Sequence, residues 1–216
     1  MIISLIDGVN KENSTRLLWV ATAMIFFAGC KTAPSTPLTG EAGRLYETKA
    51  QIKNGNESNT VKIQIALMPN KAMRMEVTAT LGVSIATVLV TTTQIRIALH
   101  NSKEFIVGPV TEKTLYPVFR QNVSPRVLWK IVHDESPAWA KLKCELNELK
   151  KPVSCAGIEG TTLNYTYESA VQRRILIKNN TFEMDWIFKD QMQLPEYQSE
   201  TFVLKKPESY KEIVIK

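Results

Sequence analysis

The chain has 216 residues, of which 44% are hydrophobic and 22% are charged, and its formal net charge is +6. This length and composition are ordinary for a globular protein and suffice for one domain with a sizeable core. The excess of positive charge either favours anionic lipid headgroups or belongs to a solvated surface. A nucleic-acid partner is disfavoured, because no basic run is interleaved with aromatic residues.

The first feature along the chain is an apolar run from Leu17 to Cys30, which Arg16 precedes. Its uncharged part, Leu17–Ala28, is shorter than the roughly 20 residues that a membrane-spanning helix needs. A charged flank, a short apolar core and an exit of small residues are typical of an export signal. An ordinary signal peptide and a buried helix with a chance cysteine are the alternatives to the more specific interpretation that follows.

The segment Phe27–Cys30, FAGC, resembles the lipobox of bacterial lipoproteins, in which Leu is preferred at the position of Phe27. The resemblance implies that residues 1–29 are removed as a signal peptide and that the Cys30 sulfur carries a diacylglyceryl group. Two or three acyl chains would anchor the protein durably, because each buried methylene contributes ~0.8 kcal/mol. The protein is then expected in the bacterial cell envelope, bound to membrane lipid through Cys30.

The residues that follow the anchor predict its placement. Lys31, where enteric inner-membrane lipoproteins have Asp, favours the outer membrane, with the protein facing the periplasm. Residues 30–44 are rich in Pro, Ser, Thr and Gly and are predicted to form a flexible tether. Residues 45–216 are predicted to form the folded domain, as a monomer.

Alternation of apolar and polar residues predicts six strands in the first half of the folded region. They are Leu45–Lys53, Thr60–Leu67, Lys71–Thr78, Ser84–Thr92, Gln94–His100 and Lys103–Val107. Strands joined by such short turns must be antiparallel, because parallel neighbours need long crossovers. One apolar and one polar face are expected for a sheet with one solvated side.

The remaining sequence predicts two helices and then more strands. The helices are expected over Thr111–Arg120 and Pro125–Val132, with an apolar stripe on the second that packs on the sheet. The further strands are predicted over Trp139–Leu146, Val153–Ala156, Thr161–Glu168, Arg173–Lys178, Thr181–Phe188, Thr201–Lys205 and Glu212–Lys216.

Cys144 and Cys155 remain after the anchor cysteine is set aside. In an oxidising compartment an even pair predicts a disulfide, and the short loop it closes stabilises by ~3 kcal/mol in the chain-entropy model. A metal site is the first alternative, but no other ligand lies at suitable spacing nearby. A redox pair is the second, and it would favour the closer spacing of Cys-x-x-Cys.

The search for catalytic motifs finds none. His100 and His133 are the two histidines, and neither belongs to a zinc-binding motif. There is no nucleophile-elbow serine, and glycines are too few for a phosphate-cradling loop. We therefore expect a protein that is not an enzyme and that uses no cofactor and no metal.

The order of lipobox, tether, six-stranded meander, two short helices and further strands resembles the LolA/LolB-type lipoprotein-localisation factors. The most specific local match is residues 79–84, ATLGVS, between two long strands, although Thr80 stands where that loop usually has Pro. The resemblance implies an α+β, mainly β fold: an open antiparallel half-barrel whose concave apolar face is lidded by a helical insert and receives acyl chains. By the same match Leu81, Gly82 and Val83 would form a membrane-insertion loop.

The apolar alternation suggests which side chains line the cavity that the resemblance implies. They are Ile63, Ile65, Met73, Met75, Val77, Ile97, Met184 and Trp186. The alternative for each is plain core packing. The implied function is to accept lipoproteins by their acyl chains from a periplasmic carrier protein and to insert them into the outer membrane. The alternative is a structural or assembly lipoprotein with a filled cavity that binds a protein partner.

Overall fold

A single sheet of twelve strands organises the computed structural model, which describes residues 43–68, 70–137, 142–157, 160–194 and 199–216. The strand order is β12-β6-β5-β4-β3-β2-β1-β11-β10-β9-β8-β7. The predicted signal peptide, Cys30 and nearly all of the predicted tether lie outside these residues.

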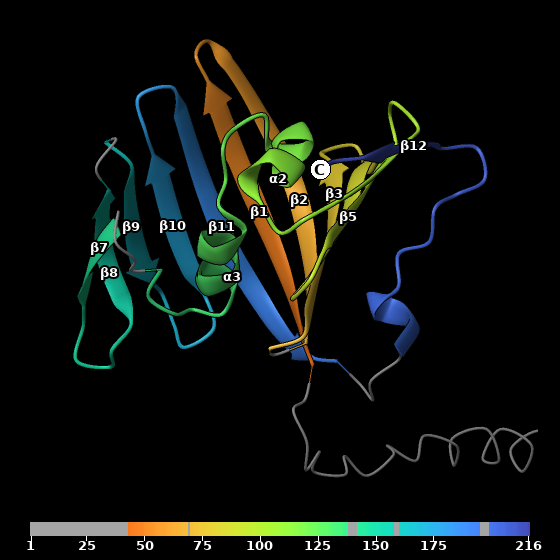
Figure 1. Ribbon diagram of the computed structural model, residues 1–216. Coiled ribbons are helices and arrows are strands. Elements are labelled where there is room, and N and C mark those ends of the chain that lie inside the picture. Colours follow the sequence, from red (N-terminus) through yellow and green to blue (C-terminus); the bar gives the residue numbers. More distant parts are fainter. Residues whose placement is uncertain (1–42, 69, 138–141, 158–159, 195–198) are drawn as a thin grey trace, which may run out of the picture. The chain divides into compact units, whose positions relative to one another are not determined.

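The first six strands form an antiparallel meander, as the alternation predicts (Figure 1). They are β1 (Arg44–Asn54), β2 (Glu57–Met68), β3 (Ala72–Ala79), β4 (Ser84–Thr91), β5 (Ile95–Leu99) and β6 (Glu104–Gly108). The β1–β2 turn is tight because Gly55 adopts a φ of 59°, which costs glycine little.

Two short helices follow the meander and lie over one face of the sheet (Figure 1). They are α2 (Glu112–Phe119) and α3 (Pro125–Val132), within one or two residues of the predicted ranges. Pro125 occupies the first turn of α3, where a missing N–H costs no helical hydrogen bond. Leu128 and Ile131 of α3 and Leu115 of α2 are buried against the sheet.

The second half of the chain adds five more antiparallel strands. They are β7 (Leu142–Leu146), β8 (Pro152–Gly157), β9 (Thr162–Tyr167), β10 (Arg173–Lys178) and β11 (Phe182–Gln193). Strand β11 pairs with β1 along its full length, so that the last hairpin of the sequence lies beside the first. The sheet stays open, because β12 and β7 end it and each has one strand neighbour among the described residues.

The prediction of a strand over Thr201–Lys205 is wrong. A 3₁₀ helix, η1 (Ser199–Phe202), and an extended segment occupy this region instead. Leu204 is buried against Leu89 and Phe105 on the face of the sheet away from the helices, so the segment packs on the sheet rather than pairing within it. This long crossing lets β12 (Lys211–Val214) pair with β6 in the parallel direction.

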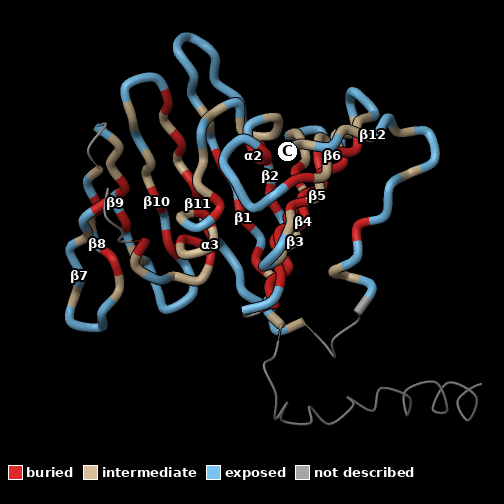
Figure 2. The backbone as a smooth tube through the Cα atoms, in the orientation of Figure 1, coloured by how far each residue is buried: buried red, intermediate tan, exposed pale blue. Residues whose placement is uncertain are grey.

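The main core lies between the helices and the sheet, on what we call the helix-covered face. Register places Ile63 opposite Val77, and Val77 opposite Ala86, so that apolar side chains from neighbouring strands form continuous rows. Figure 2 shows the buried positions alternating with exposed ones along the strands. The fold is thus the open, mainly antiparallel sheet with a helical insert that the sequence predicts.

A disulfide joins Cys144 on β7 to Cys155 on β8, as the cysteine count predicts. The two residues are direct partners in the register, with a Cα–Cα distance of 4.0 Å. Cys155 is buried against the core, whereas β7 is the last strand of the sheet. The disulfide therefore fixes the edge hairpin, which has a neighbour on one side only.

We predict that the Cys144→Ala/Cys155→Ala variant has a free energy of unfolding lower by about 2–3 kcal/mol. Without the disulfide the unfolded chain has more conformational entropy, which favours unfolding. Urea titration of the oxidised proteins measures this difference. Reducing agent should lower the stability of the wild type to that of the variant and leave the variant unchanged. Equal denaturation midpoints for oxidised wild type and variant would contradict the prediction.

Candidate functional site

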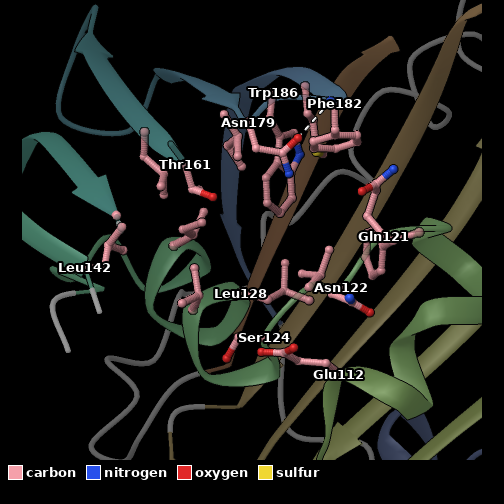
Figure 3. Close-up of a pocket in the computed structure, with 18 residues that line it drawn as sticks. Glu112, Gln121, Asn122, Ser124, Leu128, Leu142, Thr161, Asn179, Phe182 and Trp186 are labelled. Atoms are coloured by element: carbon pink, nitrogen blue, oxygen red, sulfur yellow. Dashed lines mark hydrogen bonds between the residues drawn. The ribbon is translucent and has the colours of Figure 1, made fainter. Parts of the chain in front are cut away.

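A pocket of about 370 Å³ lies between the helices and strands β9, β10 and β11 (Figure 3). Its volume falls within the range of roughly 300–1,000 Å³ that is usual for small-molecule sites. The apolar part of its wall is formed by Phe119, Val123, Val127, Leu128, Ile131, Leu142, Leu163, Ile177, Phe182, Met184 and Trp186. The pocket is thus an unfilled part of the main core.

The polar side chains of the pocket come from the start of α2, the loop between the helices and two strand turns. They are Glu112, Gln121, Asn122, Ser124, Thr161 and Asn179. Asn179 is fixed by its turn, because its side-chain oxygen accepts hydrogen bonds from the backbone N–H groups of Thr181 and Phe182. Glu112 is the one charged residue in the lining. An apolar wall with a few polar groups suits a ligand with an apolar body and a small polar end.

Trp186 is the largest side chain in the wall, and hydrogen bonds hold its ring in place. The indole Nε1 donates to Thr48 Oγ1 at 2.9 Å, and Thr48 Oγ1 donates to the carbonyl of Ile63 at 2.8 Å. Trp186 is 1% exposed, so its indole N–H needs this partner. The ring therefore presents a fixed apolar surface to the pocket.

Helix α3, which covers the pocket, is tied to the sheet by Arg173 of β10. The Arg173 Nη2 donates to the carbonyl oxygens of Ile131 and Val132, at 3.1 and 3.0 Å, in the last turn of α3. The guanidinium also lies 3.9 Å from the ring centroid of Phe188, within the range of a cation–π contact. A cation at this helix end also complements the helix dipole.

Arg173 is 4% exposed, so its charge needs compensation. Burial lowers the pKa of Arg173, and the carboxylate of Asp134, at 3.6 Å from Nε, opposes that shift. Asp134 follows α3 in the chain and also accepts a hydrogen bond from the hydroxyl of Tyr167. One buried cation thus joins α3 and the segment after it to the strands beneath.

The predicted insertion loop is a tight turn between β3 and β4 that holds apolar side chains out in water. Leu81 is 93% exposed and Val83 is 57% exposed. The Ala79 N–H donates to Val83 and the Gly82 N–H to Ala79, while Gly82 adopts a φ of 81° that suits glycine. The antiparallel order places this turn at the same end of the sheet as Asn179, in the β10–β11 turn.

The pocket contacts two of the eight residues predicted to line a cavity, Met184 and Trp186. The other six lie on the same face but are buried in the main core: Ile63, Ile65, Met73, Met75, Val77 and Ile97. The pocket lies over β9–β11, on another part of the same face. Sequence reasoning missed Leu163 and Ile177, although the alternation in their strands already placed them on an apolar face.

The histidine, cysteine and carboxylate side chains do not gather into a metal site in the part of the chain that is described. Within it, no group of three His, Cys, Asp or Glu side chains is placed to hold a metal ion. His100 is engaged by Thr87 and by the hydroxyl of Tyr210, on the face away from the pocket. No helix among the described residues has the length and apolar character to cross a bilayer.

Comparison with solved structures finds the same fold at low sequence identity. A LolA superfamily protein from Nitrosomonas europaea matches with a TM-score of 0.51 and 8% identity, over 76% of this chain and 91% of that one. A domain assigned to outer-membrane lipoprotein sorting, from Vibrio parahaemolyticus, matches with a TM-score of 0.50 and 10% identity, over 76% and 90% of the two chains.

A DUF1329 family protein from Desulfovibrio piger matches with a TM-score of 0.51 and 9% identity, over 76% of this chain and 90% of that one. No protein-family model and no curated protein matches the sequence. At these identities the likeness establishes the fold: an open, mainly β sheet with two helices, of the kind found in the LolA superfamily.

We predict that Arg173→Met lowers the free energy of unfolding by about 2–4 kcal/mol, because the α3 carbonyls and Asp134 lose a buried partner. Hydrogen exchange should also speed up selectively in α3, since its attachment to β10 is gone. Denaturant titration and exchange mass spectrometry measure the two effects.

Arg174→Met is the matched control for this prediction. Arg174 is the next residue of β10, is exposed, and pairs with Asp185 rather than with α3. It should leave stability and α3 exchange nearly unchanged. If both variants behave alike, Arg173 does not hold the helix.

Proposed function

We propose that this protein is an envelope lipoprotein that binds acyl chains in the pocket under α3 and passes lipoproteins into the outer membrane. The observation that carries the proposal is the pocket itself: an apolar space inside the main core, roofed by a short helix, with polar groups around it. The fold shared with a domain assigned to outer-membrane lipoprotein sorting supports the same proposal.

Binding follows from the hydrophobic effect. Each methylene that enters the pocket contributes ~0.8 kcal/mol, and α3 moves aside because its own apolar contacts are replaced by those of the ligand. The hydrogen bonds from Arg173 to α3 set the energy that this movement requires. Acyl chains then pass between carrier, pocket and membrane down a gradient of affinity, without catalysis and without a cofactor.

The remaining parts have distinct roles in the proposal. Cys30 carries the lipid anchor that holds the protein at the outer membrane on its periplasmic side. A periplasmic carrier protein delivers the cargo. Leu81 and Val83 enter the bilayer surface, because an exposed apolar pair on a rigid turn is otherwise unfavourable in water. The loop and the Asn179 turn of the pocket lie at the same end of the sheet, which shortens the path of an acyl chain.

We predict that Val127→Trp weakens acyl-chain binding by roughly tenfold or more, a loss of at least ~1.4 kcal/mol, because the indole fills part of the pocket. Val127 is partly buried on α3 and lines the pocket. Displacement of a fluorescent fatty acid measures the affinity. The control is Val153→Trp on β8, where the side chain is 42% exposed and lies outside the pocket lining. Equal affinities in the two variants would contradict the assignment of the pocket.

We predict that Leu81→Glu leaves acyl binding unchanged but slows lipoprotein transfer to vesicles roughly tenfold or more, because a carboxylate is costly to bury among lipids. A fluorescent lipoprotein released to liposomes gives the transfer rate. The control is Val203→Glu. Val203 is 45% exposed and belongs to the segment that packs on the face of the sheet away from the helices. Normal delivery by the Leu81→Glu protein would show that the loop has no part in insertion.

The two edge strands favour a second candidate function. Within the described part of the chain β7 and β12 each have one strand neighbour, so that each offers backbone groups to an added strand. In this alternative the protein is an assembly lipoprotein that binds a partner chain, and no lipid enters the pocket. Native mass spectrometry distinguishes the two functions, since only the first gives copurified acyl compounds.

A further inference from the structure

A second cleft, of about 440 Å³, lies at the opposite end of the sheet from Asn179. It is bounded by the start of β1 at Arg44, the segment after α3 from His133, the β7–β8 turn at Lys150, and the β9–β10 turn at Ala170. Because β10 (Arg173–Lys178) connects the turn that holds Ala170 to the turn that holds Asn179, the cleft and the apolar pocket are at opposite ends of that strand. The proposed acyl site does not use this cleft.

The cleft is strongly cationic. Arg44, Lys150, Lys151 and Arg173 all line it, against the carboxylate of Asp134, which pairs with Lys151 at 2.8 Å. The other carboxylate in the lining, that of Glu135, is already paired with Lys130. Arg44 and Lys150 form no ion pair with any described residue. The positive charge in the cleft therefore exceeds what its own carboxylates can balance.

Buried hydrogen-bonding atoms without partners lie in the same cleft. Neither ring nitrogen of His133 has a hydrogen-bond partner among the described residues, although both are buried. The Nε of Arg173, a side chain that is 4% exposed, makes no hydrogen bond either, and its ion-pair contact with the Asp134 carboxylate is long, at 3.6 Å. Leaving buried donors without an acceptor lowers the stability of the folded protein, so a ligand that accepts hydrogen bonds is favoured here. Burial lowers the pKa of His133, which leaves a neutral ring with one N–H to donate.

These observations specify the chemistry of the ligand. It must be anionic, to balance Arg44 and Lys150, and it must present several acceptor oxygens. A guanidinium beside an ammonium suits a phosphate group. Leu149, which also lines the cleft and is 77% exposed, offers an apolar contact next to that phosphate.

We propose that this cleft binds a phosphate group, borne either by a membrane phospholipid or by a soluble phosphate compound. Its position fits a lipid headgroup, because Arg44 begins the strand that follows the predicted tether and Leu149 lies exposed beside the cations. The apolar pocket is not required for this binding, so either proposal can fail alone.

The first experiment uses the full chain with Cys30→Ala, so that no acyl anchor contributes, produced in an oxidising compartment. Inorganic phosphate is titrated while the ¹⁵N signals of the His133 ring are followed by NMR. The expected result is a saturable shift. Arg44→Gln/Lys150→Gln should weaken the affinity for phosphate roughly 30-fold, because each of the two cations contributes a similar share of the attraction to an anionic group. The control is Lys49→Gln/Lys62→Gln, which removes the same charge from two exposed partners on β1 and β2.

The second experiment measures sedimentation of the same proteins with vesicles of phosphatidylglycerol and phosphatidylcholine, with and without glycerol phosphate as competitor. Vesicle binding that only the Arg44→Gln/Lys150→Gln change weakens identifies a phospholipid headgroup. A His133 shift with phosphate, but no vesicle binding, identifies a soluble phosphate compound. The proposal is overturned if neither probe binds, or if both double variants lose binding equally, because the attraction is then one of general charge. Thermal unfolding confirms that each variant is folded.

Discussion

The structure depends on one constraint: an open sheet cannot bury its own apolar face. On strands β3 and β5, Met73, Met75 and Ile97 are buried in the main core. Over β9–β11 the short helix α3 is the cover, and a pocket remains beneath it. The cover is held by its apolar residues Leu128, Ile131 and Val132 and, at one end, by hydrogen bonds from the buried cation Arg173.

The two ends of the sheet differ in their chemistry. One end carries the exposed Leu81 turn and the polar Asn179 turn of the pocket. The other carries the cationic cleft around Arg44 and Lys150, where the described chain begins. Antiparallel order fixes this division, since each turn must lie at one end or the other. The apolar end suits contact with a bilayer interior, whereas the cationic end suits an anionic group such as phosphate.

Most of the strands and both helices could be predicted from the sequence, because period-two alternation and short turns determine a meander. The segment Thr201–Lys205 could not, since apolar residues such as Leu204 look the same whether a strand pairs in a sheet or packs across it. The prediction of the pocket lining was incomplete for a similar reason. Alternation assigns Ile63 and Met184 to one face, but it does not tell which part of that face is filled by neighbours and which part is empty. Arg173 gave no signal, because nothing in its sequence context indicates that an arginine is buried.

The most direct test of the account is whether an acyl chain enters the pocket beside Trp186. A fatty acid brominated along its chain quenches tryptophan fluorescence only at close approach. We expect saturable quenching in the wild type and in Trp129→Phe, because Trp129 lies outside the lining of this pocket, and a loss of most of that quenching in Trp186→Phe. Absence of quenching, or quenching that Trp186→Phe leaves unchanged, would contradict the claim that this pocket holds acyl chains.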